Sequence, residues 1–183
     1  MSRLRSIGSI GRALLAAPLL VMFLGGPSLA AERWEVLSVP ELGFAVDLPG
    51  TPQTRQKNED LINVLAVHQY LVPVGDGIAA VSVMDFRPAA RALPLATDEQ
   101  VFRYVIDNYV GFCEGALKEE PLAVAVGSGR QTRRVCNDDK IAIRTHYHLV
   151  GNRLFNIVVG GPDGVDDGEV ARRIFESFRV TNN

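Results

Sequence analysis

The feature that most constrains the fold of this chain is a series of short segments in which apolar and polar residues alternate. Alternation with a period of two is typical of a β-strand that buries one face. In the clearest segment, one side carries Ile141, Ile143, Thr145, Tyr147 and Leu149. A Gly-Asn pair then leads into a second segment, 154–159. Because strands joined by such short turns pair antiparallel, the sequence predicts a sheet built from hairpins.

Eight strands are expected from this pattern. They cover residues 34–39, 44–48, 61–72, 78–86, 122–126, 131–136, 141–149 and 154–159. Residues 53–60 are polar and fit either a loop or the start of the next strand. Residues 87–96 contain two prolines and are expected to form a loop. Val180 is a candidate for a short final strand.

Two helices are expected beside the strands. The first begins at Thr97, which forms a capping box with Gln100, and runs to about Lys118. Its apolar side carries Val101, Val105, Tyr109, Phe112 and Ala116. The second begins after Asp166 or Asp167, and its inner side carries Val170, Ile174, Phe175 and Phe178. The sequence therefore predicts an α+β fold: one antiparallel sheet flanked by two main helices, in a single domain over residues 31–183.

Residues 1–30 are expected to be a signal peptide. Three arginines and no acidic residue flank an apolar run over residues 13–24, and Ser28-Leu29-Ala30 offers a small-residue cleavage site. The run is shorter than the ~20 residues that span a bilayer, so no transmembrane span is expected after cleavage behind Ala30. Export predicts a periplasmic or secreted protein. Cleavage removes three positive charges and moves the formal net charge from −2 to −5, which disfavours nucleic acid as a partner.

The chain has two cysteines, Cys113 and Cys136. An even number of cysteines in an exported chain favours a disulfide, because oxidising compartments preserve such bonds. The alternative is two buried free thiols. A bond that closes a loop of this length stabilises the fold by about 3 kcal/mol at best. The sequence predicts that this bond joins the first helix to the sheet.

Three further segments carry a resemblance to a known fold. Trp34 followed by residues 43–52 (GFAVDLPGTP) is similar to the opening G-F-x-V-x-x-P-G-x-P of many small exported bacterial proteins. Residues 151–159 (GNRLFNIVV) resemble their last hairpin, and residues 173–180 (RIFESFRV) resemble their closing helix, F-x-x-S-F. Together these segments resemble the Mog1/PsbP-like fold, an antiparallel sheet flanked by helices.

The resemblance implies a domain that binds or helps to assemble something without catalysing a reaction. PsbP proteins assist photosystem II, and Mog1 binds a nuclear GTPase. Neither role carries over to an exported chain of this kind, because a fold does not determine a function.

His146 and His148 are the candidate metal ligands. Alternate residues of a strand project to one face, so both imidazoles could meet one zinc or copper ion. A third ligand would be needed, and His68 could supply it only from an adjacent strand. The plainer interpretation is that both residues, with Arg144, form the polar face of a half-buried strand.

Four arginines are the candidate binding residues: Arg130, Arg133, Arg134 and Arg144. They would form a basic patch for an anionic partner, or they would pair with acidic residues across the sheet. A separate acidic group comprises Asp163, Asp166, Asp167 and Glu169. Its spacing departs from an EF-hand and fits the acidic start of the last helix better.

The favoured function is an exported, non-catalytic binding or assembly-type domain whose partner is an unknown protein or envelope component. With 47% apolar and 22% charged residues, the chain is too apolar to be disordered. Ser128 lies outside a G-x-S-x-G motif, and no phosphate-binding loop is present, so the enzyme question stays open but leans towards no. No cofactor is expected. The alternatives are a metal-binding protein or metal-dependent hydrolase that uses His146 and His148, and a periplasmic small-molecule carrier with a pocket between sheet and helix.

Overall fold

The computed structural model describes residues 33–57, 63–93, 95–109, 115–136, 140–162 and 164–181. Within these ranges the chain forms two antiparallel sheets and three α-helices, all in one unit that spans Glu32–Asn183. None of the described helices is both long and apolar enough to cross a bilayer. The predicted α+β class is confirmed, but the strands divide between two sheets rather than one.

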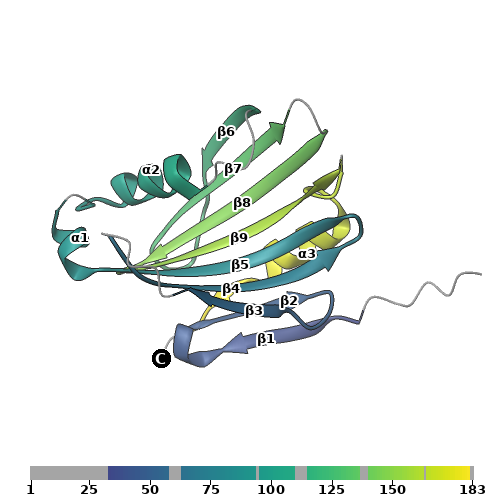
Figure 1. Cartoon of the computed structure of the whole chain (residues 1–183), viewed down its shortest axis with the longest axis horizontal. Coiled ribbons are helices and arrows are strands. Elements are labelled where there is room, and N and C mark those ends of the chain that lie inside the picture. The colour runs from purple at the N-terminus through teal and green to yellow at the C-terminus, as the bar shows by residue number, and fades with distance from the viewer. Residues whose placement is uncertain are drawn as a thin grey trace, which may run out of the picture. The chain divides into compact units, whose positions relative to one another are not determined.

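The larger sheet has seven strands in the order β3-β4-β5-β9-β8-β7-β6 (Figure 1). The strands are β3 (Gln53–Lys57), β4 (Val64–Val74), β5 (Gly77–Phe86), β6 (Gly115–Pro121), β7 (Ser128–Cys136), β8 (Ile141–Val150) and β9 (Arg153–Pro162). The predicted hairpins β4–β5 and β8–β9 are present. The sheet is completed by antiparallel pairing of β5 with β9, which are far apart in the sequence.

The smaller sheet has the order β1-β2-β10, with β1 (Glu35–Val39), β2 (Phe44–Leu48) and β10 (Arg179–Val180). A 3₁₀ turn, Pro40–Leu42, connects β1 to β2 and ends at Gly43, whose φ is +72°. Glycine suits this position because its backbone is left-handed, and because a side chain there would lie 3.2 Å from the carbonyl oxygen of Thr181. After β2, the Pro-Gly-Thr-Pro segment 49–52 carries the chain into the larger sheet.

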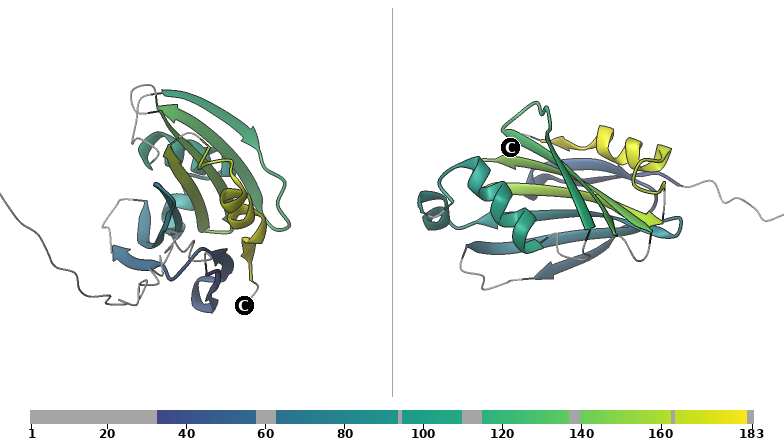
Figure 2. Two further views of the ribbon diagram at one scale, coloured as in Figure 1. Left: turned by 90° about the vertical axis from the view of Figure 1, so that its right-hand side faces the viewer. Right: turned by 90° about the horizontal axis from the view of Figure 1, so that it is seen from above.

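Helices cover the larger sheet on both faces (Figure 2). The short helix α1 (Pro88–Ala92) and α2 (Asp98–Tyr109) pack on one face. Helix α3 (Glu169–Ser177) and the smaller sheet pack on the other. Alternation along β9 shows the division, because Leu154 belongs to the α2 cluster and Phe155 to the α3 cluster.

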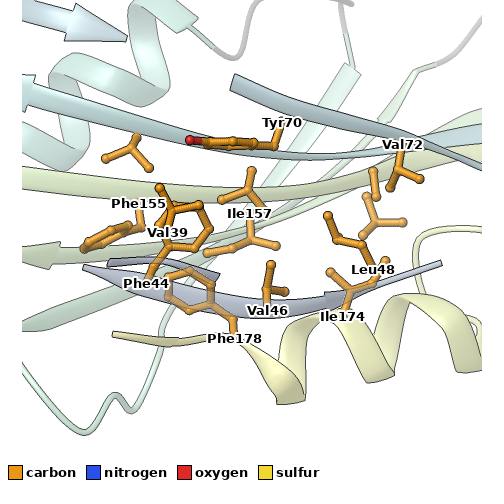
Figure 3. Close-up of a cluster of buried hydrophobic side chains, with 14 of the residues drawn as sticks. Val39, Phe44, Val46, Leu48, Tyr70, Val72, Phe155, Ile157, Ile174 and Phe178 are labelled. Carbon is orange, nitrogen blue, oxygen red and sulfur yellow. The ribbon is translucent and has the colours of Figure 1, made fainter. Parts of the chain in front are cut away.

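Phe44 is the centre of the core between the two sheets (Figure 3). Its side chain is fully buried, and its ring lies 5.6 Å from that of Tyr70, 6.0 Å from Phe155 and 6.1 Å from Phe178. Beside this core, the Ser177 hydroxyl accepts a 2.9 Å hydrogen bond from the backbone N–H of Asp47. The segments that carry the family resemblance therefore meet in space, and their residues build the fold.

The helix expected over residues 97–118 is wrong in its second half. Its capping box is present: the Thr97 hydroxyl accepts the Gln100 N–H at 3.2 Å, and Gln100 Oε1 accepts the Thr97 N–H at 2.9 Å. However, α2 ends at Tyr109, and Gly115 begins the edge strand β6. A side chain at Gly115 would lie 2.0 Å from the carbonyl oxygen of Val135, so glycine permits the close approach of β6 to β7.

Two other expectations change. The segment 87–96 contains α1, which Pro88 begins at the first helical position, where its missing N–H has no cost. The strand expected over residues 122–126 is absent, and β6 takes its place as the partner of β7. Residues 53–57, which fitted either a loop or a strand, form β3 and pair with β4.

Cys136 ends β7, is 5% exposed and lies opposite Gly115 of β6. No cysteine among the described residues is a free thiol. The expected partner, Cys113, lies outside the described residues, so the Cys113–Cys136 bond stays a prediction.

Candidate functional site

Cross-strand register aligns charged side chains on the α3 side of the larger sheet. Lys118 lies opposite Arg133, and Arg133 lies opposite Arg144. In the next row, Glu120 lies opposite Gln131. Because residues directly opposite each other project to the same face, these five side chains share one surface, which we call the β6–β8 polar face.

The β6–β8 polar face surrounds a hollow of about 250 Å³. The hollow is lined by Lys118, Glu120, Gln131, Thr132, Arg133 and Arg144. It is built from β6, β7 and β8, at the end of the sheet opposite β3 and β4 (Figure 1). This part of the molecule therefore offers charged and hydrogen-bonding groups to solvent.

Asp166 anchors the segment before α3 to this face. It is fully buried, and Arg133 binds it through two hydrogen bonds, from Nε to Oδ2 at 2.6 Å and from Nη2 to Oδ1 at 3.3 Å. The Nε of Arg144 lies 4.0 Å from the same Oδ2. The expectation that Asp166 or Asp167 caps the last helix is wrong, because α3 begins at Glu169 after Gly168. A buried carboxylate needs a cationic partner, and two of the candidate arginines surround this one.

The other carboxylate of the β6–β8 polar face is also paired. Lys118 Nζ lies 2.6 Å from Glu120 Oε1, and Gln131 Nε2 donates to Glu120 Oε2 at 3.1 Å. The hydrogen bond from Lys118 is the main cause that lowers the pKa of Glu120. Arg144 differs from its neighbours, because it makes no hydrogen bond to any described residue and its Nε is buried without an acceptor.

The structure does not bring the four candidate arginines together in one patch. Arg130 and Arg134 project to the opposite face of β7, towards α2. Arg130 forms ion pairs with Glu99 and, at 3.1 Å, with Glu119, and its guanidinium lies 5.4 Å from the centre of the Phe102 ring. Its role in this structure is to hold α2 against the sheet.

His146 and His148 pack under α3. The His146 ring lies 4.0 Å from that of Phe175 and is nearly parallel to it, and the His148 ring lies 4.7 Å from that of Phe178. The pKa of each imidazole is lowered to about 4, mainly by burial, and the charges of His148 and Arg144 contribute to the lowering at His146. The sequence placed both residues on the polar side of β8, but that side is covered.

The metal hypothesis gains no third ligand from the described residues. His68 lies on β4, which β5 and β9 separate from β8. Across the described ranges, no group of three or more His, Cys, Asp or Glu side chains is arranged to hold a metal ion. Metal binding by His146 and His148 stays an untested prediction.

The carrier hypothesis required a pocket between sheet and helix. The interface between the larger sheet, α3 and the smaller sheet is filled by buried apolar side chains (Figure 3). A second hollow, of about 450 Å³, lies along the outer side of α2 and is lined by Leu95, Glu99, Gln100, Arg103, Tyr104, Asp107 and Asn108. Neither of these two hollows lies between the larger sheet and α3, and the carrier hypothesis stays an untested prediction.

Comparison with known proteins identifies the fold. No protein-family model matches the chain, and no curated protein matches its sequence. Among solved structures, the chain is similar to the solution structure of cyanobacterial PsbP (CyanoP) from Synechocystis sp. PCC 6803. The two share 15% sequence identity with a TM-score of 0.54, over 86% of this chain and 98% of that one. The chain therefore has a PsbP-like fold, which confirms the fold that the resemblance implied.

Proposed function

We propose that this chain is an exported, non-catalytic domain that binds a protein or other envelope component through the β6–β8 polar face. The observation that carries the proposal is the charged hollow on this face, in which Arg144 is one-third exposed and has no hydrogen-bond partner among the described residues. Fixed charges on a rigid sheet suit recognition, because a partner supplies the missing counter-charge without rearrangement. The carboxylates beside it, Asp166 and Glu120, are already paired and so are poor candidates for acid–base chemistry.

Export belongs to the proposal, and one measurement tests it together with the disulfide. Protein recovered from the exported fraction should begin at Ala31, and its intact mass should be lighter by two hydrogens than the mass after reduction. The expected causes are cleavage behind Ala30 and oxidation of Cys113 with Cys136. Retention of Met1 would contradict cleavage behind Ala30, absence of the protein from the exported fraction would contradict export, and two titratable thiols in denaturant would contradict the bond.

Site-specific photo-crosslinking tests the binding surface. A photoreactive phenylalanine analogue replaces Lys118, whose side chain is 75% exposed on the polar face, and a control replaces Asp107, which is exposed on α2. In cells that export the protein, position 118 should give a discrete adduct that position 107 does not give. An excess of unlabelled mature protein should compete for it. The proposal fails if position 118 gives no adduct or if both positions give the same products.

A further inference from the structure

We infer that the β6–β8 polar face takes a single carboxylate, held by the guanidinium of Arg144. The inference rests on the proposed function, because it assumes that this face is the binding surface. It adds the chemical class of the group that the face recognises and the residue that recognises it.

The backbone of Arg144 is held between two strands, but its side chain makes no hydrogen bond to a described residue. It lies on β8, between β7 and β9, where it is opposite Arg133 and Val159. Its Nε is buried without a hydrogen-bond acceptor, and at 4.0 Å the nearest Asp166 oxygen is beyond hydrogen-bond distance. One-third of its side chain remains exposed, so an acceptor from outside can reach the guanidinium.

The charges around the hollow leave room for one negative charge. Among the described residues, Lys118, Arg133 and Arg144 are the cations at the hollow, and Glu120 and Asp166 are the anions. Lys118 is paired with Glu120, and Arg133 is hydrogen-bonded to Asp166. Arg144 shares the Asp166 carboxylate with Arg133 at 4.0 Å, so these five described side chains carry one positive charge in excess. A carboxylate carries one negative charge, whereas a phosphate group carries about 1.5 to 2 at neutral pH, so a carboxylate is the better match.

The adjacent strand shows this recognition inside the protein. Arg133 holds the Asp166 carboxylate with two donors of its planar guanidinium, the geometry that arginine and carboxylate share. Arg144, one strand away, carries the same planar guanidinium and is one-third exposed. A hollow of about 250 Å³ admits a carboxylate with its first carbon atoms, and it is formed by an open sheet face that an acidic side chain of a partner can approach.

A nuclear magnetic resonance titration tests the inference with defined probes. Sodium acetate is added to ¹⁵N-labelled mature protein at neutral pH, with sodium chloride keeping the ionic strength constant. We expect saturable shifts of the Arg144 Nε–H and of neighbouring amides in β7 and β8, with half-saturation in the millimolar range. Arg144→Gln should abolish these shifts. Arg103→Gln, the same change at an arginine that is 63% exposed on α2, should leave them intact.

Further probes identify the source of the carboxylate. Blocked pentapeptides with a central Glu or Gln represent a protein partner. Tighter binding of the Glu peptide than of acetate would support a protein side chain as the ligand, and equal binding would support the carboxylate group alone. The inference is overturned if acetate and the Glu peptide give no saturable shift, if the Gln peptide binds as well as the Glu peptide, or if inorganic phosphate binds more tightly than acetate.

Arg144→Lys separates recognition from folding. Lysine keeps a positive charge beside Asp166 but lacks the planar guanidinium, so we expect half-saturation to rise several-fold in a folded variant. Unchanged binding by this variant would contradict a guanidinium site. If position 118 gives a specific cross-link but acetate causes no shifts, the proposed binding surface is supported and only the inference of a carboxylate ligand is overturned.

Discussion

Acidification from about pH 7 to about pH 4 should lower the free energy of unfolding by several kcal/mol, because two imidazoles are neutral under α3. His146 and His148 lie against Phe175 and Phe178, and burial lowers the pKa of each from 6.5 to about 4. Between these pH values the unfolded chain binds protons at both histidines, whereas the folded chain does not. Stability is therefore fully present above pH 6.5 and is lost as the pH falls towards 4.

The change in the free energy of unfolding per pH unit is measurable. Each imidazole contributes at most about 1.4 kcal/mol per pH unit within the window, and the partial exposure of both rings reduces the sum. Urea unfolding at about pH 5, 6 and 7 should show the decline, because this range lies above the pKa of most carboxyl groups. The double variant His146→Leu, His148→Leu should lose most of the slope.

The matched control is His68→Gln, because His68 lies on β4 away from α3. It should keep the wild-type slope. Equal free energies of unfolding at about pH 5 and about pH 7 in the wild-type protein would show that the two imidazoles are not held neutral by the fold.

Phe44→Ala should destabilise the protein by about 3–5 kcal/mol, the range for truncation of a fully buried aromatic side chain. Phe44 has no exposed surface and contacts Tyr70 and Phe155 of the larger sheet and Phe178 after α3. Its truncation leaves a cavity where the two sheets and the end of α3 meet. The measurement is the urea midpoint at neutral pH, with the m-value monitored for two-state behaviour.

Val36→Ala is the control for Phe44→Ala. Val36 belongs to β1 of the same small sheet but is 61% exposed, so its truncation should cost about 0.5 kcal/mol or less. Comparable losses for the two variants would mean that Phe44 does not hold the sheets together.

The local pattern of apolar and polar residues predicted the hairpins correctly, but it did not predict the edge strand β6. The alternation of Tyr147 and Leu149 with His146 and His148 predicted β8 and its two sides correctly, because side chains of a strand alternate whatever covers them. Alternation disappears in β6, whose Lys118, Glu119 and Glu120 belong to an edge strand that is open to solvent. In the sequence, the apolar spacing of the preceding helix continues into the first residues of β6. The helix predicted from that spacing was therefore too long and covered the start of β6.

The candidate site shows the same limit. From the sequence, the arginines and the acidic group before α3 were two unrelated clusters. Register places Arg133 and Arg144 on one face of the sheet, and Arg130 on the other. The buried position of Asp166, with Arg133 beside it, depends on contacts between residues 33 positions apart. No local pattern contains that information.

The sequence alone determined β1, β2, β4, β5, β7, β8 and β9 to within a few residues, the start of α2, the approximate position of α3 and the two sides of β8. These properties follow from local periodicity, turn chemistry and capping, which act within a few residues. Tertiary structure alone decided that the strands form two sheets, that α3 covers the histidines and that Arg144 stays open to a ligand. These properties depend on which distant surfaces bury each other, and burial determines whether a polar residue is a packed side chain or a binding group.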